Sequence, residues 1–562
     1  MFNNTPINCN LYFKETTMNT IYFKNHRKTG NDAYDLFRLI ADLGTKKDIK
    51  IIFDKDTYNI DPDYCFEKCV NISNHGWNGY KRFFALLDEM ENVELDFCGS
   101  TIVSKGVLTP FGILNSKNVT VKNAILENEN TQFLQARIIA HGDGYVDLEK
   151  MYGASQFYLR HNRELATNYY ECFFVIQDSI EYNGNTGEIE HGTADHTFGY
   201  LWEMRFEDIG DNKLRLHGVK RYPPIGNITI FSAARRLGCG FFCEDSSDIT
   251  LENITIHSCY GMGILAQTCH NIHLNCFNTL RKGDQLYTAN ADGSHFVNCT
   301  GLVLVENSTF EGQLDDALNI HGMYTRIESK SERELIVREV HGQSRGIRIL
   351  RDGDRIQIVN NESFVPYTEK TIIKAEYINQ DIIRLILKED TDDIKVGDDV
   401  ESLDRTPDLI FRNNIVRNNR ARGMLIATRG KTVIENCYFH TSGSAILFDP
   451  NGSYWFESGG VQDVTIRNNN FDSCKYANWG SAVISCVPRK AVEEGKYFNR
   501  EIKVIDNKFH MTMGYTVQFD NIQHAIFKNN TVTAAEGIEP KITLNHIGNA
   551  EIETNITVER LG

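Results

Sequence analysis

The sequence predicts an all-β protein: a right-handed parallel β-helix interrupted by two inserted antiparallel β-barrel-like domains. A strand pattern of apolar, any, Asn, any, any, apolar recurs through much of the 562-residue chain. Two of its copies, at Asn413 and Asn436, lie 23 residues apart. Short β-branched strands, turn residues and a period in the low twenties are typical of a β-helix, in which each repeat forms one coil.

The asparagines of this pattern are interpreted as structural. Asparagine adopts left-handed turn geometry readily, and stacked side-chain amides can hydrogen-bond along the axis of a coil. Seven copies of the pattern centre on Asn123, Asn253, Asn307, Asn413, Asn436, Asn468 and Asn529.

Two stretches lack the asparagine pattern and instead contain alternating apolar segments, which indicate inserted antiparallel strands. Ahead of them, residues Gly30 to Asp32 offer a cap for a helix over residues 33–40, and this helix could close one end of the coil stack. The predicted units are an N-terminal cap with the first coils (1–130), an inserted domain (131–225), central coils (226–322), a second inserted domain (323–405) and C-terminal coils (406–562).

Charge and apolar patterning argue against a nucleic acid or a membrane as partner. The formal net charge of −16 disfavours a nucleic-acid partner, because phosphate binding needs clustered Lys and Arg. No uninterrupted apolar segment approaches membrane-spanning length, so no membrane association is predicted. The first residues do not read as a signal peptide, so the expected location is cytoplasmic, or periplasmic or secreted if a leader has been trimmed.

The fourteen cysteines are scattered rather than clustered in metal-binding spacings. Buried free thiols are therefore expected, and neither a metal nor a cofactor is predicted.

A second repeated strand, with Gly or Ala at its second position, carries the candidate catalytic residues. Asp292 and Asp316 occupy its first position in two successive copies, 24 residues apart, and Asp315 adjoins them. Three carboxylates would then share one small surface, which raises the pKa of at least one of them. The repulsion has to be offset, so a functional role is favoured over a solvated edge.

Acids on adjacent coils suit the cleavage of a glycosidic bond. One carboxylic acid protonates the leaving oxygen and another carboxylate activates water from the opposite face of the sugar. Side chains on adjacent coils can reach the separation of ~6.5–9.5 Å that inversion of configuration needs, although a closer, retaining pair is not excluded.

Secondary candidates surround these acids in sequence register. Arg422 falls in the acid column one coil later and could hold a sugar hydroxyl or a carboxylate, or form a structural salt bridge. His295 and Asn319 share another column, where they could contact substrate or be satisfied buried polar groups. His321 could tune a carboxylate.

Further candidates lie outside these columns. Trp455 could form an apolar platform for a sugar ring or pack in the core, and Glu457 could accept hydrogen bonds from hydroxyls. Gln267 and Arg429 complete the predicted substrate-binding set.

Three motifs resemble glycoside hydrolase family 110, the α-1,3-galactosidases: Ala291 to Phe296, Glu311 to Gly322, and Phe456 to Gly459 after Trp455. The resemblance extends over most of the chain, and the acids are more distantly similar to those of polygalacturonase-type β-helix hydrolases. It implies an inverting, metal-independent exo-enzyme that acts on an α-galactosyl oligosaccharide or glycoconjugate. The blood group B determinant and linear α-1,3-galactosyl structures are the implied substrates.

The same resemblance implies roles for the three acids. Asp315 would be the general acid, and Asp292 and Asp316 would hold the nucleophilic water. Which of these two is the base stays open.

Two alternatives remain at this point. One is another β-helix enzyme, either a polygalacturonase-like hydrolase or a lyase, although the separate Gly-His-Gly and Arg-Ile-Lys elements of polygalacturonases are not evident and the acid column has no lysine. The other is a non-catalytic carbohydrate-binding β-helix. Exposed β-helix faces and the insertions could pair two copies into a homodimer.

Overall fold

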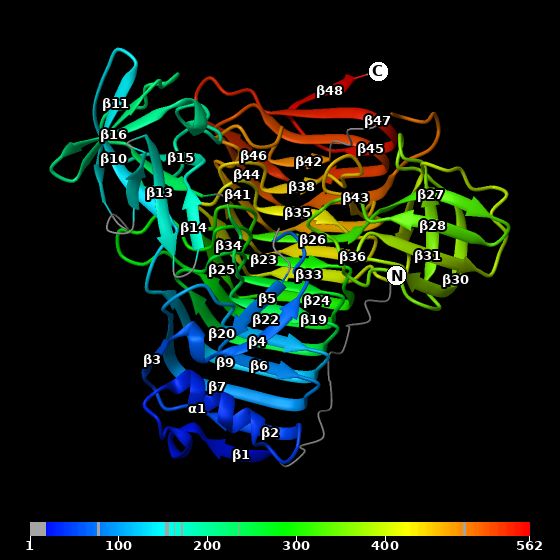
Figure 1. The fold of residues 1–562 in the computed structure, drawn as a ribbon. Helices are drawn as coiled ribbons and strands as arrows, with labels where there is room; N and C mark the ends of the chain where they lie inside the picture. The colour runs from blue at the N-terminus through cyan, green and yellow to red at the C-terminus, as the bar shows by residue number, and fades with distance from the viewer. Residues whose placement is uncertain are drawn as a thin grey trace.

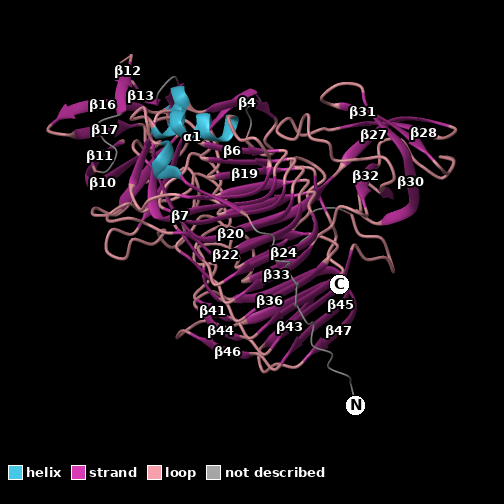
Figure 2. Ribbon diagram, turned by 90° about the horizontal axis from the view of Figure 1, so that it is seen from below, coloured by secondary structure: helices cyan, strands magenta, loops and turns pink. Residues whose placement is uncertain are grey.

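A computed structural model describes residues 18–75, 79–151, 157–161, 163–169, 172–233, 235–486 and 491–561. Its centre is a 31-stranded sheet wound into a parallel β-helix. The coils rise from the N-terminal end, blue in Figure 1, to the C-terminal end, red. Figure 2, seen from below, shows the coils stacked with their strands side by side. The predicted fold class is confirmed.

Each coil contributes strands to three faces, and each strand pairs in parallel with its counterpart in the next coil. Strands on the first face are β1 (Asn19–Tyr22), β2 (Lys47–Ile52), β24 (Thr300–Glu306), β33 (Asp408–Arg412), β36 (Lys431–Glu435), β40 (Asp463–Arg467) and β43 (Asn499–Ile505). Those on the second face are β3 (Thr57–Ile60), β25 (Thr309–Glu311), β34 (Ile415–Arg417), β37 (Tyr438–His440), β41 (Asn470–Asp472), β44 (Lys508–Met511) and β46 (Thr531–Ala534).

The third face carries the repeated strand with the small second residue. Its strands are β6 (Ala85–Asp88), β8 (Phe111–Leu114), β19 (Phe241–Glu244), β21 (Ile264–Gln267), β23 (Ser294–Val297), β26 (Leu318–Met323), β35 (Met424–Ala427), β38 (Ile446–Phe448), β42 (Ile484–Cys486) and β48 (Thr557–Leu561). Longer strands bend across two faces: β7 (Glu91–Ser104), β9 (Lys117–Asn128), β20 (Ser247–Ile256), β22 (His270–Thr279), β45 (Tyr515–Lys528) and β47 (Lys541–Ile552).

The asparagines of the repeat make the bend between the first two faces. Asn253 has a φ of 51° and Asn413 a φ of 56°, both left-handed. Their side chains form a ladder along the axis, since Asn253 Nδ2 donates to Asn123 Oδ1 at 2.8 Å. The structural interpretation of these residues is therefore confirmed.

A second asparagine, directly after the first, forms an inner ladder. Asn469 is buried, its Oδ1 accepts from the backbone N–H of Cys437 at 2.9 Å, and its Nδ2 donates to the carbonyl of Ile434 at 2.9 Å. Asn507 repeats this arrangement one coil later. These amides pair the backbone groups that the bend removes from the sheet ladder.

Stacked apolar side chains fill the space inside the coils. Phe111 and Phe241 stack with ring centroids 4.5 Å apart, and Phe471 stacks on Phe509 at 4.7 Å. Every cysteine whose side chain is described carries a free thiol, and most of them face this core.

Helix α1 (Asp32–Ala41) covers the N-terminal end of this core. Its N-cap is Asn31, whose side chain accepts from the N–H of Tyr34, and Leu36 and Leu39 are buried in the coil core. Short 3-10 turns are η1 (Phe23–His26), η2 (Pro62–Tyr64) and η4 (Leu201–Glu203). Among the described residues no helix has both the length and the apolar character needed to cross a membrane.

The first insertion projects from one side of the coil stack (Figure 1). It comprises an open six-stranded antiparallel sheet and a three-stranded one, and its last strand ends seven residues beyond the predicted limit of 225. The strands are β10 (Phe133–Gly142), β11 (Tyr145–Lys150), β12 (Phe157–Arg160), β13 (Glu164–Tyr169), β14 (Cys172–Val175), β15 (Asp178–Tyr182), β16 (Arg205–Gly210), β17 (Lys213–His217) and β18 (Ile228–Ser232).

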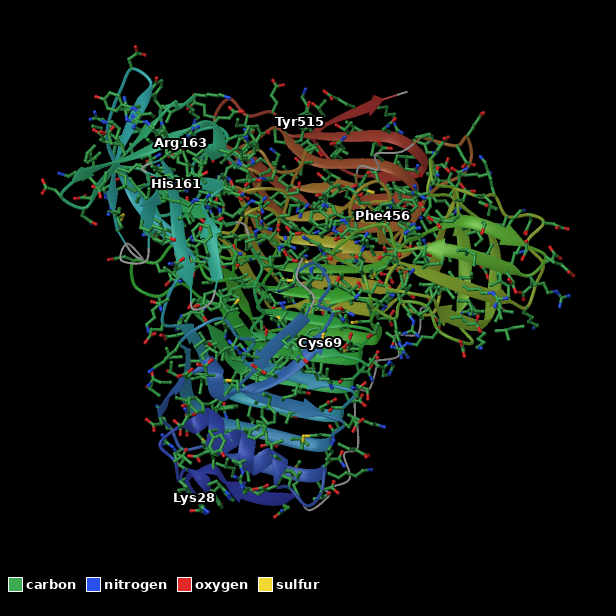
Figure 3. The ribbon with its side chains drawn as sticks, in the orientation of Figure 1. Lys28, Cys69, His161, Arg163, Phe456 and Tyr515 are labelled. Carbon is green, nitrogen blue, oxygen red and sulfur yellow. The ribbon has the colours of Figure 1, made fainter. Side chains whose placement is uncertain are left out.

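The second insertion is a closed antiparallel barrel on the opposite side of the stack (Figure 1). Its strands are β27 (Thr325–Ser331), β28 (Glu334–Arg338), β29 (Arg355–Val359), β30 (Pro366–Tyr377), β31 (Ile382–Leu387) and β32 (Asp399–Ser402). A hairpin of β4 (Phe66–Val70) and β5 (Gly79–Phe83) lies across the coils, where Figure 3 labels Cys69. The two insertions and this hairpin surround the middle coils.

Because of the inner ladder, substitutions at two neighbouring asparagines should differ in their effect on the stability of the protein. Asn469→Ala leaves a buried N–H and a buried carbonyl without partners, which costs about 2 kcal/mol or more. Urea unfolding followed by circular dichroism measures this loss. The matched control is Asn468→Gly, because Asn468 is exposed and has a φ of 55° that glycine adopts freely. Equal midpoints for the two variants would contradict a structural role for the inner ladder.

Candidate active site

The three acids lie at one corner of the coils, where the chain enters the third face. Asp292 precedes β23, and Asp315 and Asp316 precede β26. The residues that follow Asp292 and Asp316, Gly293 and Ala317, point into the coils: a Cβ on Gly293 would lie 2.6 Å from a ring carbon of Phe310. Only a small residue fits there, and Asp292 and Asp316 lie on the outer side of the strands.

The acids stack in the predicted register. The backbone N–H of Asp316 donates to Asp292 Oδ1 at 3.2 Å, and that of Arg422, one coil later, donates to Asp316 Oδ1 at 3.2 Å. The Arg422 guanidinium also binds both oxygens of Asp316, at 2.8 and 2.9 Å. The column therefore supplies its own counter-charge.

Asp315 stands beside this column and faces three guanidinium groups. Arg236 donates to its Oδ2 at 3.0 Å, whereas Arg420 and Arg422 approach its Oδ1 at 3.3 and 3.6 Å. Its side chain is 16 % exposed, compared with 4 % for Asp292 and 1 % for Asp316. Asp315 is thus the most accessible of the three carboxylates.

The first insertion holds one of these arginines in place. Arg420 forms a bidentate pair with Asp195, at 2.6 and 2.7 Å. Asp195 also accepts from Trp479 Nε1 at 3.4 Å. An insertion residue far from Arg420 in sequence therefore fixes the side chain that reaches Asp315.

The acids line a cavity of about 560 Å³. Other parts of its lining come from several units of the fold: buried Asn74 from the β4–β5 hairpin, Trp455 from the loop that precedes β39 (Glu457–Ser458), and Trp479 from a later coil. The second insertion supports the hairpin, since the N–H of Asn74 donates to the carbonyl of Gln343 at 3.1 Å. The cavity is polar on its acid side and aromatic at its rim.

A chain of hydrogen bonds leads from Asp292 into the protein. His295 Nδ1 lies 2.5 Å from Asp292 Oδ2, His295 Nε2 lies 2.9 Å from His321 Nε2, and His321 Nδ1 lies 2.6 Å from the carbonyl of Gly322. Because a carbonyl only accepts, His321 donates through Nδ1. With both imidazoles neutral, His295 donates through Nε2 and accepts through Nδ1. Asp292 is then the donor and holds a proton.

The pKa shifts of these groups agree with a protonated Asp292 and a neutral His295. Burial, together with the charge of Asp315, raises the pKa of Asp292 to about 8. Burial holds the pKa of His295 well below its usual value. Burial also raises the pKa of Asp316, but Arg422 acts in the opposite direction. Because Arg422 binds both oxygens of Asp316, the proton that these two neighbouring acids retain lies on Asp292.

Most of the predicted substrate-binding residues meet at this cavity. Arg422, His295, Asn319, Trp455 and Glu457 line it. Asn319 Oδ1 is buried and has no hydrogen-bond partner among the described residues, so its acceptor is unused by the protein. Glu457 is placed by β39, which pairs antiparallel with the end of β26.

The remaining three predicted residues lie outside the lining. His321 is behind His295 and 3.6 Å from a Glu457 oxygen. Gln267 donates to Glu244 at 2.6 Å and to the carbonyl of Asn71 at 2.7 Å, and therefore anchors the segment that leads to Asn74.

Arg429 extends toward the second insertion rather than the cavity. Its guanidinium lies 3.4 Å from Glu401 of the barrel.

Several lining residues were missed by sequence reasoning: Asn74, Arg236, Arg420, Asp449, Asn451 and Trp479. They lie in a hairpin, in connecting segments or next to coil strands, outside the repeated columns. Two signals were available in the sequence: the pair of arginines at 235–236, and Arg420, which stands two residues before the predicted Arg422.

The acid cluster also has the spacing of a cation site. Asp292, Asp315 and Asp316 each place one oxygen within 4.8 Å of the others. Arg422 and Arg236 already bind oxygens of two of these acids, so a cation would compete with guanidinium groups for the same atoms. The arrangement as it stands is that of a carboxylate cluster balanced by arginine.

Comparison with known proteins matches the chain to two domain families. Residues 334–400 match the GLAA-B beta-barrel domain II, and residues 402–559 match the right handed beta helix region.

Relatives that are similar over most of the chain are named alpha-1,3-galactosidases A or B. Alpha-1,3-galactosidase B of Phocaeicola vulgatus is 30 % identical over 516 residues, which cover 87 % of this chain and 86 % of the relative. Alpha-1,3-galactosidase B of Bacteroides fragilis is 30 % identical, with 84 % of this chain and 82 % of the relative covered. Alpha-1,3-galactosidase A of Shewanella woodyi is 29 % identical, with 82 % and 76 % covered.

Solved structures resemble the chain more distantly. The mannuronan C-5 epimerase A-module of Azotobacter vinelandii has 9 % identity and a TM-score of 0.41, covering 95 % of this chain and 100 % of its own. The Family 28 exopolygalacturonase of Yersinia enterocolitica has 9 % identity and a TM-score of 0.35, covering 97 % and 77 %.

Because Asp292 keeps its proton in the folded protein, the free energy of unfolding should depend on pH. The folded-state pKa, about 8, lies above the usual 3.8, so the unfolded chain releases a proton that the folded chain keeps. This group's contribution to stability is full below about pH 4 and is lost as the pH rises to about 8. Asp292→Asn mimics the protonated acid, and its melting temperature should exceed that of the unmodified protein by a margin that grows from pH 5 to pH 8.

Differential scanning calorimetry at several pH values measures this margin. The control is Asp63→Asn, whose side chain is 60 % exposed and should give the same small difference at each pH. A margin for Asp292→Asn that shrinks as the pH rises would contradict a protonated Asp292.

Proposed function

Because the chain belongs to the alpha-1,3-galactosidase family, we propose that it is an inverting exo-enzyme that hydrolyses terminal α-1,3-linked galactose. The proposed substrates are glycans such as the blood group B determinant and linear α-1,3-galactosyl structures. The observation that carries the proposal is the stacked pair Asp292 and Asp316, with Asp315 beside it, at the base of a cavity with an aromatic rim. Aromatic rims with a few convergent polar groups suit sugar rings.

Asp315 is proposed as the general acid that protonates the leaving oxygen. It is the most exposed carboxylate of the three and lies outside the column, so a bound glycosidic oxygen can approach it. Arg236, Arg420 and Arg422 surround its carboxylate. When substrate binds, its hydroxyls would replace some of the contacts between these arginines and Asp315, and Asp315 could then be protonated.

Asp292 and Asp316 are proposed to hold the attacking water. Both oxygens of each acid are already engaged: Arg422 donates to both oxygens of Asp316, whereas Asp292 accepts from the Asp316 N–H through Oδ1 and donates its proton to His295 through Oδ2. A carboxylate engaged at both oxygens is a poor nucleophile but can still accept a hydrogen bond from water. This supports direct attack by water rather than a covalent intermediate.

Asp292 is the better candidate for the base within this pair. Its proton would pass to His295 Nδ1 as the Nε2 proton of His295 passes to His321, so that the added charge rests on His321, 3.6 Å from a Glu457 oxygen. The carboxylate left at Asp292 can then take a proton from water. Asp316, locked by Arg422, would orient the water. The closest acid oxygens lie within 4.8 Å, shorter than the usual separation of ~6.5–9.5 Å, so hydrogen bonding rather than spacing carries the proposal of inversion.

A polygalacturonase-like activity fits the cavity less well. An acidic sugar would need a guanidinium that is not already neutralised. Arg236, Arg420 and Arg422, which line the described part of the cavity, each contact an aspartate. A neutral sugar makes no such demand.

Two substrates with different leaving groups test the roles of the acids. Fluoride departs from α-galactosyl fluoride without protonation, whereas the second sugar of α-1,3-galactobiose needs a proton from a general acid to depart. Asp315→Asn should lower kcat on the disaccharide by about 10²–10⁴-fold and on the fluoride by less than about tenfold. Asp292→Asn should impair both substrates, because both reactions need the activated water.

Galactose release, followed with a coupled dehydrogenase assay, gives both rates. Circular dichroism of each variant checks that it is folded. Full activity of Asp315→Asn on the disaccharide would overturn its role as acid, and no galactose release by the unmodified protein would overturn the proposed activity.

A further inference from the structure

A short loop beside the cavity is held in one conformation by a single side chain. Asn451 Oδ1 accepts from the backbone N–H groups of Ser453, Tyr454 and Trp455, at 3.2, 2.8 and 3.0 Å. The loop is closed by the N–H of Asn451, which donates to the carbonyl of Glu457 at 2.9 Å. These hydrogen bonds therefore fix the backbone of the loop at Tyr454 and Trp455.

The backbone of this loop reverses at Phe456, which has a left-handed φ of 56°. A left-handed backbone conformation is costly for a bulky residue, and residues that adopt it tend to lie at functional sites. The Phe456 ring is buried among Tyr324 and Phe364, with the Arg326 guanidinium 5.1 Å above it. Figure 3 labels Phe456 between the coils and the barrel. Its neighbours Trp455 and Glu457 line the cavity, so the reversal aims both of them at the site.

The loop tip is an aromatic cluster continuous with the cavity. Tyr454 is 64 % exposed, and its ring meets the Trp455 ring edge to face, with centroids 5.0 Å apart. His341, from the second insertion, packs against Trp455 at 4.9 Å and Tyr454 at 5.4 Å. His341 Nδ1 also donates to the carbonyl of Tyr454 at 2.8 Å. The barrel thereby holds the outer ring in place.

We propose that Tyr454, braced by His341, forms a second sugar subsite that takes the hexose to which the terminal galactose is linked. The inference rests on the proposed function, because it assumes that a galactose occupies the cavity. A glycan anchored at the acids has to leave the cavity across its rim, and Tyr454 is the exposed ring that adjoins the lining residue Trp455. The apolar C–H face of a pyranose packs on such a ring.

Trp479, the other tryptophan in the described lining of the cavity, is less suited to this role. Trp479 Nε1 donates to Asp195 at 3.4 Å, and the Arg420 guanidinium lies 5.7 Å from its ring. These protein contacts engage its ring, whereas most of the Tyr454 side chain faces solvent. Because the loop is already ordered, binding at Tyr454 costs little conformational entropy.

Substrates with and without a second sugar test the subsite. Tyr454→Ala should lower kcat/KM for α-1,3-galactobiose by about 3- to 10-fold, the range expected for loss of one ring contact. It should leave kcat/KM for α-galactosyl fluoride unchanged, since fluoride offers nothing to bind there. Tyr454→Phe, which keeps the ring, should behave as the unmodified protein on both substrates.

The matched control is Tyr515→Ala, because Tyr515 is 46 % exposed and lies on the last coils, as Figure 3 shows. It should change neither rate. An equal loss on both substrates, or no loss on either, for Tyr454→Ala would overturn the subsite while leaving the proposed activity intact. If the unmodified protein hydrolyses neither substrate, the proposed function fails and takes the subsite with it.

Discussion

The stacking of Asp292 on Asp316 is the constraint to which the rest of the site responds. Neighbouring strands of a sheet are separated by ~4.8 Å, so acids at one position of consecutive coils are forced close together. Two buried charges at that spacing repel strongly. The fold offsets the repulsion in two ways: Arg422 neutralises Asp316, and Asp292 shares a proton with His295.

The insertions complete what the coils cannot supply. A coil repeats its own geometry, so it can place a column of side chains but cannot close a pocket around them. Asp195 of the first insertion fixes Arg420, and the second insertion supports Asn74 and the loop around Tyr454. Figure 1 shows the two insertions on opposite sides of the same middle coils. Their placement turns one part of the β-helix surface into a cavity that contains the three acids.

Sequence reasoning succeeded where the structure is periodic. The asparagine ladder and the acid column both follow from one period, because residues in register on successive coils must be neighbours. It failed where contacts span the insertions. Arg420 and Asp195 are 225 residues apart, and no period relates them. Gln267 sits on a column strand, yet its amide anchors another segment. Neither contact has a local signal in the chain.

We propose that a water molecule held by Asp292 and Asp316 attacks the sugar directly. Proton NMR of the first minutes of α-1,3-galactobiose hydrolysis, before the anomers equilibrate, tests it most directly. A single displacement predicts β-galactose as the first product. α-Galactose as the first product would show that configuration is retained and would contradict the account.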